Sequence, residues 1–109
     1  MDYLVNPKTG FRYSDEFLST QCSDVKEKIE SAIKKIERGN RGNIVKMNFK
    51  NELYNFPLYE CKVDYKQGFR IYFTEGYGHP RKVITIGTKK TQKKDVRFCA
   101  RVCGFNVAL

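Results

Sequence analysis

Two cations that could act together on a phosphodiester lie on either side of a turn at Gly68. If the flanking segments fold back as a hairpin that pairs Val63 with Phe69, Lys62 lies directly opposite Arg70. Like charges that face each other on adjacent strands lower the stability of a sheet. A fold tolerates such a pair more readily where an anion binds between the two cations.

RNA is an anion that suits this pair, because its 2′-hydroxyl is a built-in nucleophile. Cleavage then needs a base for that hydroxyl and positive charge for the phosphorane. A lysine among other cations has a depressed pKa and can be the base, and an arginine can stabilise the phosphorane. We predict these roles for Lys62 and Arg70, without a metal or cofactor, although the pattern alone does not favour catalysis over binding.

A basic stretch follows the hairpin. Residues 81–101 contain one acid, Asp95, and eight cations, namely Arg81, Lys82, Lys89, Lys90, Lys93, Lys94, Arg97 and Arg101. Cations bind phosphates and aromatic rings stack on unpaired bases, so a cationic face with tyrosines suits single-stranded RNA. The predicted RNA contacts are Tyr65, Tyr72, Lys90, Lys93, Lys94 and Arg97. A solvated basic face without a ligand is the alternative.

Composition favours the same class of ligand. The 109 residues include 21 Lys and Arg against 12 Asp and Glu, for a net charge of +9. This excess favours polyanions, first nucleic acid and then anionic membranes, and makes an acidic protein partner plausible. With 40% hydrophobic residues the chain should fold. No apolar run reaches the roughly 20 residues of a membrane span, and the first residues do not resemble a signal peptide, so we expect no membrane association.

Metal and histidine chemistry are not favoured. His79 is the one histidine, which excludes two-histidine acid–base catalysis within one chain. The four cysteines form no CxxC pair; they are Cys22, Cys61, Cys99 and Cys103. We therefore predict no metal site, free buried thiols and a reducing, cytoplasmic location.

The elements that must position these residues follow from periodicity. Residues 23–38 predict a helix with Ser23 as N-cap and an end at Gly39; its apolar face comprises Val25, Ile29, Ala32, Ile33 and Ile36. Residues 58–63, 69–74 and 82–86 predict strands, with His79 in the turn before the third. Residues 1–13 predict an irregular lead-in, 15–19 a helical turn, 44–56 a loop or short strand, and 88–101 helical character. The sum is one α+β domain spanning residues 1–109.

Four motifs in this order, within residues 24–97, resemble the RelE/ParE toxin superfamily and its HigB-like killer proteins most of all. They are Arg38–Asn43, Leu58–Tyr65, Gly68–Phe73 and Gly87–Gln92 with Asp95 and Val96. The resemblance implies an N-terminal helix or helical pair on one side of a small, mainly antiparallel twisted sheet, with a short C-terminal helical tail. It also implies a cognate antitoxin that covers the basic face.

Activity differs within that superfamily. Many RelE-like members cleave mRNA on the ribosome without a metal, whereas ParE-like members inhibit DNA gyrase on the same fold. By resemblance, Arg70 contacts the scissile phosphate, Lys62 is the basic residue of the preceding motif, and Lys89 and Lys90 are the basic pair after the last strand. We therefore expect a ribosome-dependent mRNA endonuclease with catalytic Lys62, Arg70 and Lys89. A gyrase inhibitor and a non-catalytic RNA-binding or partner-binding protein are the alternatives.

Overall fold

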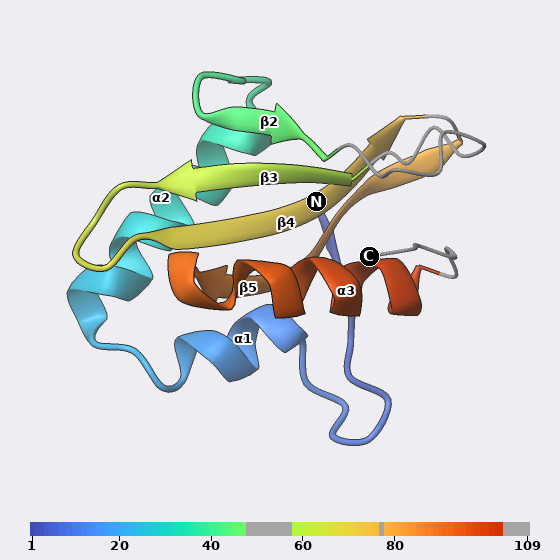
Figure 1. Cartoon of the computed structure of the whole chain (residues 1–109), viewed down its shortest axis with the longest axis horizontal. Coiled ribbons are helices and arrows are strands. Elements are labelled where there is room, and N and C mark those ends of the chain that lie inside the picture. The colour runs from blue at the N-terminus through green and yellow to red at the C-terminus, as the bar shows by residue number, and fades with distance from the viewer. Residues whose placement is uncertain (48–57, 77, 104–109) are drawn as a thin grey trace.

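The chain forms a five-stranded sheet with helices on both faces (Figure 1). The computed structural model describes residues 1–47, 58–76 and 78–103. In chain order the elements are β1 (Asp2–Tyr3), α1 (Tyr13–Leu18), α2 (Ser23–Glu37), β2 (Ile44–Lys46), β3 (Leu58–Val63), β4 (Phe69–Gly76), β5 (His79–Thr88), a 3-10 turn η1 (Lys89–Thr91) and α3 (Gln92–Val102).

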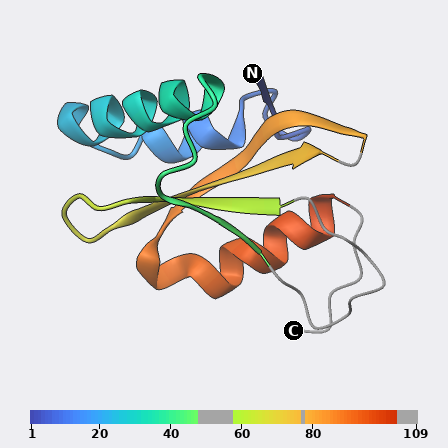
Figure 2. The same ribbon diagram turned by 90° about the horizontal axis from the view of Figure 1, so that it is seen from above.

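The strand order is β1-β5-β4-β3-β2, with β1 parallel to β5 and all other neighbours antiparallel. Seen from above, α1 and α2 lie on one face and α3 lies on the other (Figure 2). The predicted α+β class and mainly antiparallel sheet are confirmed. The expectation that the helices pack on one side of the sheet is wrong, because α3 has buried apolar residues of its own and packs on the second face. The prediction of an irregular segment over residues 1–13 is also wrong in part, because β1 joins the sheet and α1 starts at Tyr13.

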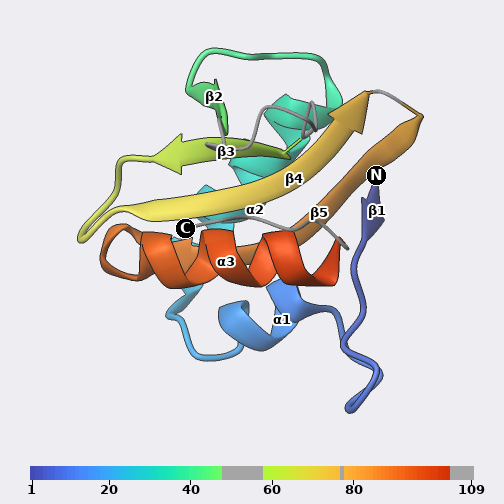
Figure 3. The same ribbon diagram turned by 45° about the vertical axis from the view of Figure 1, so that its right-hand side comes forward.

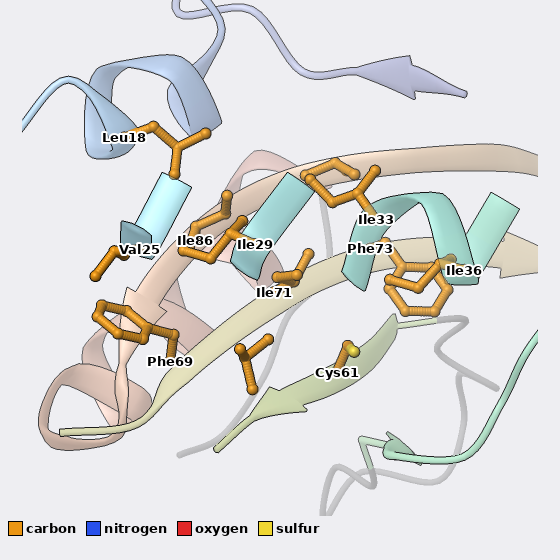
Figure 4. Packing of buried hydrophobic residues seen from close by; sticks show 12 residues of the cluster. Leu18, Val25, Ile29, Ile33, Ile36, Cys61, Phe69, Ile71, Phe73 and Ile86 are labelled. Atoms are coloured by element: carbon orange, nitrogen blue, oxygen red, sulfur yellow. The ribbon is translucent and has the colours of Figure 1, made fainter. Parts of the chain in front are cut away.

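Helix α2 and the sheet enclose the larger core (Figure 4). The buried positions of α2 recur every three or four residues and form a single apolar face; they are Val25, Ile29, Ile33 and Ile36. They meet the residues of β4 that alternate onto this face, namely Phe69, Ile71 and Phe73. The N-cap is Cys22 rather than Ser23, and the chain leaves the helix at Gly39 with a positive φ of 85°.

A smaller core lies beneath α3, which crosses the opposite face of the sheet (Figure 3). It consists of Leu58, Tyr72, Ile84, Val96 and Cys99. A bulge in the pairing of β4 with β5, between Tyr72 and Phe73, interrupts the alternation of β5, so that Ile84 and Ile86 lie in different cores although they are two residues apart. Among the described residues, no helix has the length and apolar character needed to cross a membrane.

The predicted hairpin register is confirmed. Val63 pairs with Phe69 and Lys62 with Arg70. Strands β4 and β5 are longer than predicted, and His79 pairs with Gly76 at the start of β5 instead of lying in the turn. The short strand expected within residues 44–56 is present as β2, whereas residues 48–57 lie outside the described part of the chain.

Candidate nucleic-acid interface

A cavity of about 330 Å³ opens where the β3–β4 turn meets the residue that follows β5. Arg70 and Lys89 line it together with residues 64–68 of the turn. The backbone N–H of Lys89 donates to the carbonyl of Gly68 at 3.2 Å, which ties the end of β5 to the hairpin. Gly68 has a φ of 86°, a conformation that glycine adopts without strain. Local geometry therefore brings two of the three predicted catalytic residues to one hollow.

Arg70 is nearly buried, with 6% of its surface exposed. Its Nη1 donates to the carbonyl of Phe69 at 3.0 Å, and its Nε lies 3.4 Å from Oε1 of Glu60. Glu60 is 2% exposed, and its other oxygen accepts a 2.7 Å hydrogen bond from Nε2 of Gln92. A buried ion pair thus connects β3 with β4, and Gln92 at the start of α3 holds its carboxylate in place.

A second set of contacts fixes the segment that carries Lys89 and Lys90. Thr91 Oγ1 donates to Asp95 Oδ2 at 2.6 Å, and the Thr88 N–H donates to Thr91 Oγ1 at 3.1 Å. The carboxylate packs against Gly87, where an added Cβ would lie 1.8 Å from Asp95 Oδ2. Burial raises the pKa of Asp95. Gly87 and Asp95 both belong to the fourth sequence motif. Their contact and the hydrogen bond from Thr91 to Asp95 explain the distance between them in the sequence.

The turn side of the cavity is tied to the start of α2. The Tyr65 hydroxyl donates to Asp24, and Lys66 Nζ lies 3.0 Å from the same carboxylate. Hydrogen bonds from Cys22, Tyr65 and Lys66 hold the pKa of Asp24 well below its usual range. The bond to Asp24 in turn raises the pKa of Tyr65. Tyr65 thus lines the cavity, with its hydroxyl bonded to Asp24.

The outer side of α3 and η1 is a cationic stripe, which we define as Lys90, Lys93, Lys94, Arg97 and Arg101. All five are exposed, and none forms an ion pair with a described residue. Lys93, Arg97 and Arg101 recur every four residues and so share one face of the helix. The inner side of the same helix buries Val96, Cys99 and Ala100. The stripe has the charge and exposure that a polyanion requires.

Two predicted site residues lie elsewhere than expected. Tyr72 is fully buried beneath α3, so the expectation of an open ring for base stacking is wrong. Burial also raises the pKa of its hydroxyl far above the usual value. Lys62 is exposed and lies opposite Arg70 in the register, yet it lines a separate hollow of about 400 Å³ between α2 and strands β2 and β3.

The thiols and acids offer little for a metal. Cys22 is exposed, in contrast to the buried thiols predicted, whereas Cys61 and Cys99 are buried; all four cysteines are free. Burial raises the pKa of the Cys61 thiol. Within residues 1–47, 58–76 and 78–103, no group of three or more His, Cys, Asp or Glu side chains could hold a metal ion.

Glu60 and Gln92 are the site residues that sequence reasoning missed. The signal for Glu60 was present, because the register that pairs Lys62 with Arg70 also puts Glu60 on the same face. Gln92 could not be found in this way, since its contact with Glu60 depends on how α3 docks against the sheet.

Comparisons with known proteins leave the activity open. No family model and no solved structure matches the chain. A protein of Haemophilus influenzae (strain Rd), described as an uncharacterized protein, is 32% identical over 72 residues. The match covers 66% of this chain and 66% of that protein, which is slightly under two thirds of its length.

Proposed function

We propose that the protein is the toxin of a type II toxin–antitoxin module and cleaves mRNA on the ribosome without a metal. The observation that carries the proposal is the nearly buried Arg70 at a cavity whose other wall is Lys89. The order and spacing of the superfamily-like motifs support it as well. In this proposal the toxin acts in the cytoplasm, and a cognate antitoxin restrains it.

The cavity suits the scissile phosphate. In the proposed reaction the 2′-oxygen bonds to phosphorus and the bond from phosphorus to the 5′-oxygen breaks. The 5′-oxygen takes a proton from water, so the products are a 2′,3′-cyclic phosphate and a 5′-hydroxyl. Arg70 and Lys89 stabilise the charge of the phosphorane. Lys62, opposite Arg70, takes the 2′-hydroxyl proton from an RNA strand that crosses β3 and β4.

The cationic stripe supplies affinity for RNA backbone next to this cavity. Its five side chains contact phosphates without reading sequence, so binding weakens as salt rises. Lys90, Lys93, Lys94 and Arg97 keep the RNA-contact role predicted from the sequence, and Arg101 joins them.

Primer extension on mRNA, incubated with the purified protein with and without ribosomes, tests the proposal. We expect cuts with ribosomes only, and we expect them to disappear in the Lys89→Ala and Lys62→Ala variants. Both residues are exposed, so neither change should unfold the protein. Lys34→Ala on the outer side of α2 removes the same charge far from the cavity and should leave the cuts unchanged.

One observation favours a non-catalytic RNA-binding protein as second candidate, namely that Lys62 does not line the cavity of Arg70 and Lys89. That candidate binds mRNA with steep salt dependence and leaves it intact in every lane. Intact mRNA together with inhibited DNA supercoiling by gyrase would instead support the ParE-like alternative.

A further inference from the structure

The charges around the Arg70 cavity nearly cancel. The Arg70 guanidinium faces the buried Glu60 carboxylate at 3.4 Å, and Lys66 is paired with Asp24 at 3.0 Å. Asp64 also lines the cavity, and Lys89 forms no ion pair with a described residue. Lys89 can therefore bind one negative charge, and a second charge would be repelled by Asp64 in the lining and by the Glu60 carboxylate buried behind Arg70.

We propose that Glu60 makes this cavity selective for a singly charged phosphodiester over a doubly charged phosphate monoester. The inference rests on the proposed function, because it takes the cavity as the place where the RNA phosphate binds. It adds a role for Glu60 in distinguishing an internal linkage of a strand from a phosphorylated end.

Burial makes the effect of Glu60 strong. Its side chain is 2% exposed, so solvent screens its charge poorly, and the hydrogen bond from Gln92 holds one oxygen while the other faces Arg70. A buried ion pair is weak support for stability, since apolar residues of similar volume often do as well. Electrostatic tuning of Arg70 therefore explains the placement of Glu60 better than stabilisation of the fold.

A matched pair of ligands tests the selectivity. Adenosine 5′-monophosphate carries two charges above its second pKa of about 6, whereas its methyl ester carries one. We would titrate each into the full-length protein at pH 8 and follow the backbone amide signals of Gly68 and Lys89 by NMR. The wild type should bind the methyl ester roughly tenfold more tightly than the monophosphate. This is about the factor expected when the second phosphate charge meets one partly screened negative charge.

Two variants should reduce that preference. Glu60→Gln removes the buried charge and keeps the size of the side chain, and Asp64→Asn removes the charge of an exposed side chain. Glu30→Gln, on the exposed side of α2, changes the net charge equally and should leave the preference unchanged. The Asp64 variant keeps the test valid if the Glu60 variant folds poorly.

The possible failures are distinct. Equal binding of the two ligands by the wild type, tighter binding of the monoester, or a preference that a folded Glu60→Gln variant keeps would overturn the proposed role of Glu60 and leave the phosphate site standing. If neither ligand moves the Gly68 and Lys89 signals, the cavity is not a phosphate site, and the proposed function fails with the inference.

Discussion

The two faces of β4 are built from different chemistry. Toward α2 the strand presents Phe69, Ile71 and Phe73, all without exposed surface and packed among apolar side chains. Toward α3 it presents Arg70 and Tyr72, whose polar ends are buried with few partners. The Arg70 Nε and the Tyr72 hydroxyl form no hydrogen bond with a described residue.

This difference indicates which face holds the fold together and which serves another purpose. Burial of apolar surface is the main source of stability, and the α2 face consists of little else. Buried polar groups contribute little net stability and can lower it. The α3 face keeps its ion pair at that cost, and the same arginine lines the cavity, in keeping with the proposed role of Arg70.

Breaking the ion pair should give the largest effect. Arg70→Met leaves the Glu60 carboxylate buried without a counter-charge and should lower the free energy of unfolding by about 3–5 kcal/mol in urea denaturation. The double variant Glu60→Leu with Arg70→Met replaces the buried ion pair of the α3 face with two apolar side chains. It should regain the lost stability, or exceed the wild type, and should not cleave RNA.

The double variant is the sharper of the two measurements. If it remains as unstable as Arg70→Met alone, the ion pair stabilises the fold by itself, and the contrast between the two faces disappears. An active double variant would remove Arg70 from the site altogether.

Truncation on the α2 face should be nearly as costly. Ile29 is fully buried at the centre of that core, and Ile29→Ala should lower the free energy of unfolding by about 2–5 kcal/mol. No partner residue can recover this loss, in contrast to the ion pair. Val45→Ala on the exposed side of β2 is the matched control, and it should stay within about 0.5 kcal/mol of the wild type.

The α2 face was predictable from sequence because its signals are local. Apolar residues at helical spacing identified α2, and strict alternation placed Phe69, Ile71 and Phe73 on one side of the strand. The turn at Gly68 then fixed the register of the hairpin, because a one-residue shift would have exposed the apolar set.

The α3 face was less predictable because its signals are mixed. The cations of α3 dominate its composition and obscure the narrow apolar seam of Val96, Cys99 and Ala100. The alternation of Arg70 and Tyr72 looked like an exposed side, and only the docking of α3 buries it. The bulge that sends Ile84 beneath α3 also breaks the period-two pattern of β5.

The cationic stripe should affect RNA binding without affecting stability. The variant Lys93→Ala with Arg97→Ala removes two cations from the exposed side of α3. The slope of log affinity for single-stranded RNA against log salt should then fall by about 0.7 for each cation that contacted a phosphate. Fluorescence anisotropy across a salt series measures the slope, and Lys8→Ala with Lys34→Ala, which removes two exposed cations outside the stripe, is the charge-matched control. An unchanged slope would mean that RNA does not cross α3.

The smallest effect concerns Asp24, where the start of α2 meets the turn that borders the cavity. Its carboxyl pKa is lowered by hydrogen bonds from Cys22, Tyr65 and Lys66. The stabilisation is therefore fully present above the ordinary carboxyl pKa of 3.8 and is lost as the pH falls below that value toward the lowered folded pKa. The wild type should have a slightly higher Tm than Asp24→Asn at neutral pH, and the two should converge in acid. Curves that stay parallel through this range would mean that Asp24 acts through its shape and not its charge, so that the turn is held to α2 by packing alone.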